Sequence, residues 1–274
     1  MPIRLGIFAR TYQRDDLDSV LEAVQSDGFD CIQFNLSCAG LSSLPERLGE
    51  SSCRSIRAAL TRHGIAMVAI SGTFNVIHPD ITIRSDGIRR CCGLIAEARS
   101  LGTDLVTLCT GSRDPENMWR THPDNRTPEA WSDMLQTLEQ LVVQAELHNV
   151  QLGIEPETAN VIDSVARARR LIDELRSPAL KVVMDPANLF IGDDHADMPS
   201  VLASAFDQLG NDIVLGHAKD TPSPGKGKLD FHQYLTLLSS IGFVGPLVLH
   251  NLSEADVHAS TVFLRNILDS LELA

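Results

Sequence analysis

The stretch Met184-Asp185-Pro186-Ala187-Asn188 ends the short apolar run Lys181–Met184 abruptly at a carboxylate. A short and nearly continuous apolar run is typical of a parallel strand that is covered on both faces. A carboxylate at the end of such a strand is costly to bury unless it meets a cation. The stretch therefore predicts a buried strand with a charged group at its carboxyl end.

Similar apolar runs alternate with amphipathic, helix-sized segments along the whole chain, and no linker divides it. The expected strands are Arg4–Ala9, Cys31–Asn35, Ala66–Ile70, Leu105–Cys109, Gln151–Ile154, Lys181–Met184, Ile213–Gly216 and Leu247–Leu249. The expected helices are Asp16–Gln25, Ser55–Arg62, Ile88–Leu101, Pro128–His148, Val161–Leu175, Val201–Leu209, His232–Ile241 and Ala255–Leu271. Eight such units predict an α/β fold, a single (β/α)8 TIM barrel domain over residues 1–274.

The composition and charge of the chain, and its N-terminal stretch, indicate which classes of protein it can belong to. With 43% hydrophobic and 22% charged residues, the chain can bury a large core. Its net charge of −13 repels polyanions, which argues against nucleic acid as a partner. The apolar runs are strand-sized, so no membrane span is expected. The start, Met1–Phe8, runs directly into a strand pattern without the features of a signal peptide, which predicts a cytoplasmic protein with six reduced cysteines.

Four polar groups end the last four expected strands: Glu155, Asp185, His217 and His250. In a barrel these strand ends converge near the axis, and active sites are built there. Any one of them could instead cap the following helix or pair with a basic group. Together they offer a mixed set of oxygen and nitrogen ligands, which suits Mn²⁺, Zn²⁺, Co²⁺ or Fe²⁺. The set predicts one divalent metal ion.

The chain resembles the xylose isomerase-like barrel superfamily of sugar-phosphate isomerases and epimerases over essentially its whole length. The most specific parts are the two strand-end carboxylates, the His217-Ala218-Lys219-Asp220 stretch, and Gly225-Lys226-Gly227-Lys228-Leu229-Asp230-Phe231, which is similar to the family's Gly-x-Gly-x-x-Asp-Phe. The resemblance implies metal binding by Glu155, Asp185 and His217, and it implies dimers or tetramers.

The sequence departs from the family pattern at two positions. His250 stands where the family's fourth ligand is normally a Glu, and Asn188 stands where many members carry a substrate-binding His. Imidazole is a good metal ligand, so the metal site remains plausible. The family's proton relay between two Glu residues does not transfer directly.

The resemblance implies isomerisation or epimerisation of a small sugar, keto-sugar or polyol ketone, by proton transfer through a metal-stabilised enediolate. Glu155 is the family-like proton acceptor, and Glu157 is a second carboxylate nearby. His250 either completes the metal shell or returns the proton. Lys219 either stabilises negative charge or pairs with Asp220. The same site could serve a lyase, dehydratase or hydrolase of a carbohydrate derivative, and a non-catalytic sugar-binding protein is a further alternative.

The loops after the third and fourth expected strands carry polar groups suited to a hydroxyl-rich substrate. Asn75, Thr110 and His122 either bind substrate or satisfy the backbone of these loops. Arg113 would suit a phosphate or carboxylate group. The expected substrate-binding residues are Asn75, His78, Thr110, Arg113, His122 and Asn188.

Overall fold

Eight parallel strands close into a barrel in a computed structural model that describes residues 3–190 and 197–273. Each strand pairs with its neighbours in chain order, and β8 pairs with β1 to close the ring. This is the predicted (β/α)8 barrel. The strands are β1 Arg4–Phe8, β2 Cys31–Phe34, β3 Ala66–Ser71, β4 Leu105–Leu108, β5 Gln151–Ile154, β6 Leu180–Met184, β7 Ile213–Ala218 and β8 Pro246–Leu249.

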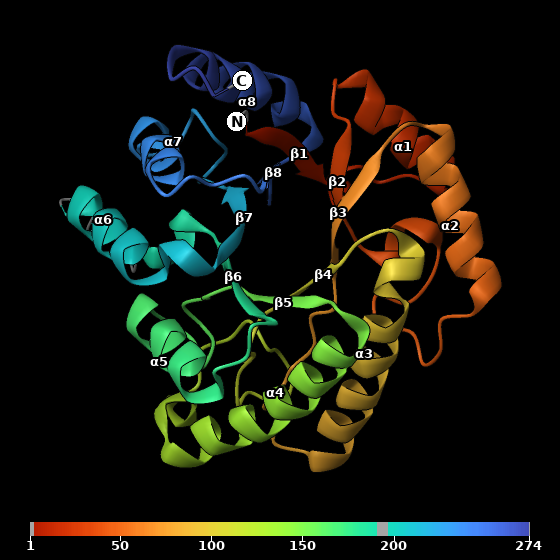
Figure 1. Ribbon diagram of the computed structural model, residues 1–274, viewed down its shortest axis with the longest axis vertical. Helices are drawn as coiled ribbons and strands as arrows, with labels where there is room; N and C mark the ends of the chain where they lie inside the picture. The colour runs from red at the N-terminus through yellow and green to blue at the C-terminus, as the bar shows by residue number, and fades with distance from the viewer. Residues whose placement is uncertain (1–2, 191–196, 274) are drawn as a thin grey trace.

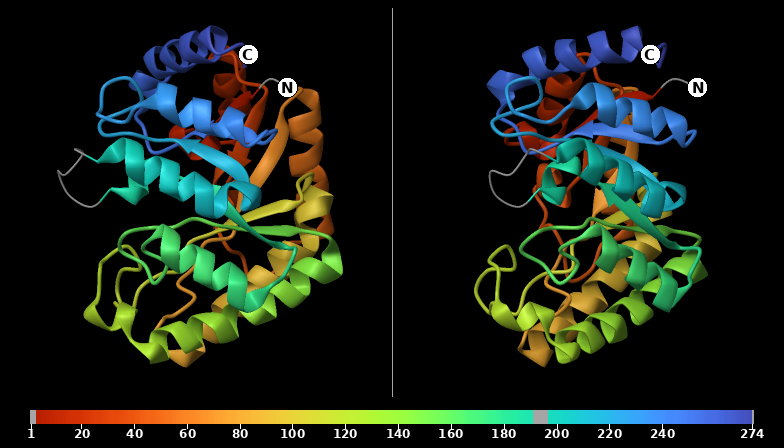
Figure 2. Two further views of the ribbon diagram at one scale, coloured as in Figure 1. Left: turned by 60° about the vertical axis from the view of Figure 1, so that its left-hand side comes forward. Right: turned by 90° about the vertical axis from the view of Figure 1, so that its left-hand side faces the viewer.

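Eight helices form a ring outside the strands (Figure 1). The two termini lie at the opposite end of the barrel from the long loop that follows β4 (Figure 2). The helices are α1 Leu17–Ser26, α2 Glu50–Arg62, α3 Ile81–Leu101, α4 Pro128–His148, α5 Val165–Leu175, α6 Met198–Leu209, α7 Phe231–Ser240 and α8 Glu254–Ser270.

Three helices begin four or more residues away from the predicted position. Helix α2 begins at Glu50 rather than Ser55, and α3 begins at Ile81 rather than Ile88. The Asp80 side chain accepts hydrogen bonds from the first-turn amides and so starts α3 a full two turns earlier. Helix α5 begins at Val165 rather than Val161, because the amide of Val161 donates to the backbone of the loop after β4 instead.

Two buried layers hold the barrel together. The larger lies between the strands and the helices, where apolar faces of both elements meet. The smaller fills the interior of the barrel with Ala69, Leu105, Val183, Leu215 and Val248. Branched side chains from several strands therefore plug the barrel below its carboxyl end, which gives that end a solid floor.

All six cysteines are free, as predicted. Across residues 3–190 and 197–273, no helix combines the length and apolar character that crossing a bilayer requires.

Gly153 on β5 lets the interior layer close. A Cβ atom at this position would lie 2.8 Å from Cγ2 of Val183 and 3.2 Å from Cδ1 of Leu105. We expect Gly153→Ala to destabilise the protein by about 1–3 kcal/mol, because the packed interior must shift to accept the methyl group. Urea denaturation followed by circular dichroism measures the change.

Gly93 provides the matched control. It lies on the exposed side of α3, and a Cβ there would meet no atom within 4 Å. Gly93→Ala should stabilise the protein by about 0.5–1 kcal/mol, because alanine is the better helix former. Equal effects of the two substitutions would contradict a tightly packed barrel interior.

Candidate metal centre

The four strand-end residues come together at the carboxyl end of the barrel. Glu155, Asp185 and His250 directly follow β5, β6 and β8, and His217 is the penultimate residue of β7. Ligand atoms of Asp185, His217 and His250 lie within 4.8 Å of one another. Nδ1 of His217 lies 3.6 Å from Oε1 of Glu155 and 3.5 Å from Oδ2 of Asp185.

Asp185 is held in place by the turn that it begins. It is the N-cap of the short 3-10 helix Pro186–Leu189, and its Oδ1 accepts a hydrogen bond of 3.1 Å from the amide of Ala187. Its other oxygen, Oδ2, is left to face His217 and Lys219. With 1% of the residue exposed, this carboxylate is among the most buried charges of the chain.

Three buried atoms at this centre lack hydrogen-bond partners. Within the described residues, Oδ2 of Asp185, Nδ1 of His217 and Nδ1 of His250 are buried and make no hydrogen bond. Leaving a buried polar atom without a hydrogen bond costs about 1–3 kcal/mol, so three such atoms gathered at one centre need an explanation. These carboxylate and imidazole donors are the ligand types that Mn²⁺, Zn²⁺, Co²⁺ and Fe²⁺ accept, so the residues present fit such an ion.

The charged groups of the centre strongly shift one another's pKa values. Burial alone would lower the pKa of His217, but the carboxylates of Glu155 and Asp185 outweigh it and raise that pKa to about 9. Burial alone would raise the pKa of Asp185, but His217 and Lys219 together lower it well below its usual range. Two negative groups, Glu155 and Asp185, thus face two positive ones, His217 and Lys219.

Lys219 belongs to the centre and not to the surface. Its Nζ lies 3.3 Å from Oδ2 of Asp185 and donates a hydrogen bond of 2.6 Å to Oδ1 of Asn188. Asn188 in turn donates from Nδ2 to Oε1 of Glu155 over 2.9 Å. Asp220, the alternative partner expected from the sequence, accepts from the amides of Thr221 and Leu229 instead.

Glu157 lies at the edge of this network. Its side chain is half-buried and accepts a hydrogen bond from Thr158. Burial raises the pKa of Glu157, and the neighbouring charge of Lys219 partly offsets that rise. The group is therefore a second carboxylate next to the centre, with a greater tendency to hold a proton.

His250 stacks face to face on His217. The ring centroids are 4.1 Å apart and the planes differ by 4°, while Phe8 stacks on the far side of His250 at 5.0 Å. The lone pair of an imidazole nitrogen lies in the ring plane, and two parallel planes do not meet. One ring must therefore tilt before both can bind a single ion. Burial and the neighbouring His217 lower the pKa of His250 well below its ordinary value.

Two residues at the centre were not found from the sequence. Gln33, on β2, accepts a 2.8 Å hydrogen bond from Nε2 of His217 through its Oε1. Cys109, just after β4, donates from Sγ to Oε2 of Glu155 at 3.9 Å. Gln33 could have been noticed in the sequence because it is a polar residue inside the apolar run Cys31–Phe34. For Cys109, the sequence offered no indication of a role other than its place at the end of a strand.

The predicted substrate-binding residues fall into two groups. Asn188 lies in the centre, as described above, whereas the side chains of the others bond mainly within the loops. Asn75 bonds to both backbone groups of Ser112, and Thr110 accepts from the amide of Ile162. Arg113 pairs with Asp133 of α4 at 2.6 Å.

The two histidines of these loops also have local partners. Both ring nitrogens of His78 have backbone partners, Pro115 and Asp80. His122 accepts from the amide of Asp124 and begins a short 3-10 helix. These contacts favour the alternative that the loop residues stabilise loop backbone; their part in substrate binding stays a prediction.

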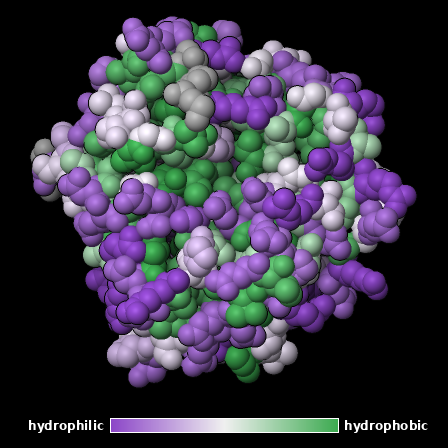
Figure 3. All heavy atoms as spheres, in the orientation of Figure 1, coloured by the Kyte–Doolittle hydropathy of each residue, from purple (hydrophilic) through white to green (hydrophobic). Residues whose placement is uncertain are grey.

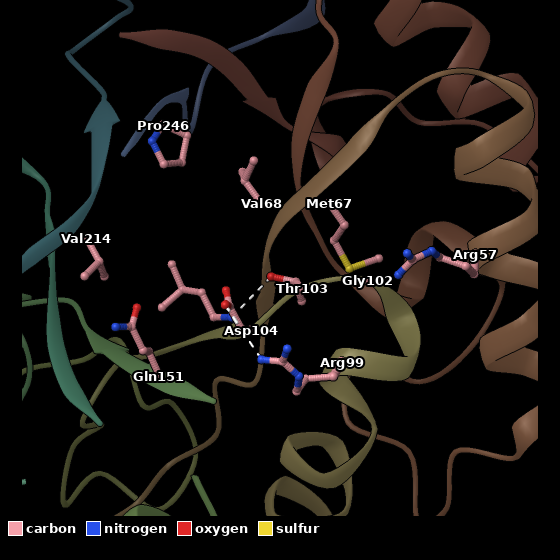
Figure 4. Close-up of a pocket in the computed structure, with 11 residues that line it drawn as sticks. Arg57, Met67, Val68, Arg99, Gly102, Thr103, Asp104, Gln151, Val214 and Pro246 are labelled. Carbon is pink, nitrogen blue, oxygen red and sulfur yellow. Dashed lines mark hydrogen bonds and ion pairs between the residues drawn. The ribbon is translucent and has the colours of Figure 1, made fainter. Parts of the chain in front are cut away.

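A cavity of about 500 Å³ lies at the other end of the barrel. Figure 4 shows Met67, Val68, Val214 and Pro246, which lie at the amino ends of their strands, together with Arg57 and Arg99 from the surrounding helices. Figure 3 shows hydrophobic residues near the centre of this face and hydrophilic ones round its rim. The cavity shares no residue with the metal centre, which lies at the carboxyl ends.

Residues 21–266 match the family described as xylose isomerase-like TIM barrel. No curated protein has significant similarity to the chain.

Solved structures share the fold at low sequence identity. The structure of 3-keto-D-glucoside 4-epimerase from E. coli superposes with a TM-score of 0.77 at 17% identity, over 96% of this chain and 99% of that one. An L-ribulose 3-epimerase gives 0.77 at 18% identity, over 99% and 97%. A D-psicose 3-epimerase from Clostridium cellulolyticum H10, solved with D-tagatose, gives 0.76 at 16% identity, over 97% and 99%.

Asn188 bridges Glu155 and Lys219 through hydrogen bonds, and we expect this bridge to stabilise the protein. Asn188→Ala removes hydrogen bonds from both Glu155 and Lys219 at a buried position, so we expect a loss of about 1–3 kcal/mol. Asn211→Ala, at an exposed position, should change stability by less than about 0.5 kcal/mol. Urea denaturation compares the two variants, and equal midpoints would show that the bridge contributes nothing.

Proposed function

The chain belongs to the xylose isomerase-like TIM barrel family, and from this premise we propose that it is a divalent-metal-dependent isomerase or epimerase of a small sugar, keto-sugar or polyol ketone. One observation carries the proposal. The three buried atoms without hydrogen bonds belong to Asp185, His217 and His250, whose ligand atoms lie within 4.8 Å of one another at the carboxyl end of the barrel.

Glu155, Asp185 and His217 would hold the metal ion, and His250 could join them only if its ring tilts. A bound divalent ion would supply Lewis-acid stabilisation of the negative charge that develops on an enediolate when a proton leaves the carbon next to a carbonyl. The donors are held before any ion binds, because Asp185 caps a turn and His217 and Glu155 are each fixed by a buried amide. Such fixed donors reduce the cost of ordering the site.

The remaining groups would handle the proton and the substrate oxygens. Glu155 would take the proton, and Glu157, whose pKa is raised by burial, would provide a second carboxyl group for transfer. Lys219 is already fixed by Asp185 and Asn188, so its ammonium can stabilise negative charge on a substrate oxygen without prior ordering. Asn188 positions both Lys219 and Glu155.

The relatives of known structure support a carbohydrate as substrate, since the three compared proteins are named as epimerases of sugars or of a keto-glucoside. A neutral, hydroxyl-rich ligand also suits a protein whose net charge of −13 repels anions. We propose a small carbohydrate as partner, and neither nucleic acid nor a membrane.

One observation favours the alternative, a lyase, dehydratase or hydrolase on a carbohydrate derivative. His250 provides an imidazole just after β8, where the resembled family has a carboxylate. With a pKa lowered by burial and by His217, this imidazole is neutral and can accept a proton from water or a hydroxyl group. Loss of water rather than exchange of a carbon-bound hydrogen would mark that chemistry.

The test of the proposed function combines metal content with hydrogen exchange. We expect the purified protein, after incubation with Mn²⁺, to hold about one ion per chain by mass spectrometry. Asp185→Ala should lose this ion because a buried ligand is removed. The matched control is Asp212→Ala, which removes a partly buried aspartate that pairs with Arg169 and Lys181 outside the centre.

Turnover is then measured as deuterium incorporation from solvent into a panel of keto-sugars. Incorporation by the Mn²⁺-loaded protein and by Asp212→Ala, but not by Asp185→Ala, is the expected result. Bound metal without deuterium incorporation would support the lyase or hydrolase alternative instead. Absence of bound metal in the unsubstituted protein would refute the metal centre.

The parallel stacking of His250 on His217 favours a proton-transfer role over a ligand role. We expect His250→Ala to slow exchange by about 10²–10⁴-fold while Mn²⁺ affinity falls by less than about tenfold. His258→Ala, at an exposed position on α8, serves as control. A loss of Mn²⁺ affinity that matches the loss of exchange would instead identify His250 as a ligand.

A further inference from the structure

The two ring nitrogens of His217 face different surroundings. Nδ1 faces the carboxylates of Glu155 and Asp185, whereas Nε2 lies 2.8 Å from Oε1 of Gln33. Both Gln33 and His217 are buried, with 3% and 0% exposed. The contact joins β2 to β7, which are not neighbours in the ring of strands, so it crosses the inside of the barrel.

The amide of Gln33 is oriented by a third strand. Its Nε2 donates a long hydrogen bond of 3.4 Å to Oγ1 of Thr107 on β4, which leaves Oε1 directed at His217. Thr107 is itself buried. Three strands thus contribute to a chain of polar side chains that runs from Thr107 through Gln33 to His217, beneath the metal centre.

This arrangement determines which nitrogen of His217 can bind a metal. A neutral imidazole has one N–H donor and one acceptor nitrogen, and an amide oxygen can only accept. Oε1 of Gln33 therefore requires the hydrogen on Nε2. The proton that His217 gives up when a metal binds must then leave from Nδ1, which presents its lone pair next to the two carboxylates. The opposite amide orientation would place the hydrogen on Nδ1 and the lone pair away from the centre.

We propose that Gln33 is a positioning residue that fixes the tautomer and the ring orientation of His217 so that Nδ1 binds the metal. This inference rests on the metal-binding part of the proposed function. Metal-bound histidines in general need a partner for the second ring nitrogen, and losing that partner typically costs about 10–100-fold in metal affinity. Gln33 provides this partner from β2, a strand that contributes none of the proposed ligands.

An uncharged partner suits the centre. Glu155 and Asp185 are already balanced by His217 and Lys219, so a third buried carboxylate would add an unbalanced charge. An amide satisfies Nε2 without that charge. A carboxylate in the same place would still accept the hydrogen from Nε2, which makes Gln33→Glu the conservative variant.

The experiment compares Mn²⁺ affinity, by competition with a chelator, in the unsubstituted protein and three variants. Gln33→Met keeps the size of the side chain and removes the acceptor, so we expect affinity to fall about 10–100-fold. Gln33→Glu keeps the acceptor and should bind within about threefold of the unsubstituted protein, or more tightly. Asn35→Ala, in the turn just after β2, removes an amide whose oxygen accepts from Ser37 and Ser43, and it should leave affinity unchanged.

A second readout observes the tautomer directly. In ¹⁵N-histidine NMR of the Zn²⁺-loaded protein, with the His217 signals identified by their loss in His217→Ala, Nε2 should carry the hydrogen in the unsubstituted protein and in Gln33→Glu. Thermal unfolding by circular dichroism confirms that each variant is folded. If Gln33→Met fails to fold, the NMR tautomer in the unsubstituted protein and the affinity of Gln33→Glu still decide the question.

Two results would overturn the inference alone: unchanged Mn²⁺ affinity in folded Gln33→Met, or a hydrogen on Nδ1 of His217 in the Zn²⁺-loaded protein. A Gln33→Glu variant as weak as Gln33→Met would also count against it. Absence of Mn²⁺ and Zn²⁺ binding by the unsubstituted protein would overturn both this inference and the proposed metal centre.

Discussion

The structure at the carboxyl end of the barrel depends on the burial of two carboxylates, Glu155 and Asp185, over the apolar floor of the barrel. A buried carboxylate without partners is very costly, and each one here is compensated by a neighbouring group of opposite charge or by hydrogen bonds. Lys219 and His217 provide the charge, and the turn at Pro186–Leu189 and Asn188 provide the hydrogen bonds. The same arrangement leaves Oδ2 of Asp185 and the Nδ1 atoms of His217 and His250 without hydrogen-bond partners.

The strands were predictable because each parallel strand is covered on both faces and appears in the sequence as a short apolar run. Helix beginnings were harder to predict. The first turn of α3 exposes Ile81 and Ile83, so its apolar residues do not follow the amphipathic pattern, and only the cap at Asp80 reveals the start. At Val161 the apolar residues continue the pattern of α5 backwards, yet their amides bond to the preceding loop.

The four strand-end residues could be predicted as a group, since carboxyl ends of barrel strands converge whatever the intervening sequence. The partners of Gln33 and Arg113 could not. Gln33 bonds across the barrel to His217, a residue far away in the sequence, and Arg113 bonds to a helix residue, Asp133. Such contacts depend on side-chain direction and loop path, which periodicity does not encode. The loop residues Asn75 and Thr110 look the same in sequence whether they bind a sugar or a backbone amide.

The stack of Phe8, His250 and His217 crosses the seam where the first strand meets the last. Because Asp185, His217 and His250 all belong to the second half of the chain and close upon β1, the centre has no local precursor in the first half. During synthesis on a ribosome, the N-terminal units can emerge and collapse, but the centre cannot assemble until β8 has been translated and paired with β1. A metal ion at this centre would then bind only to the closed barrel, so it could not guide the early steps of folding.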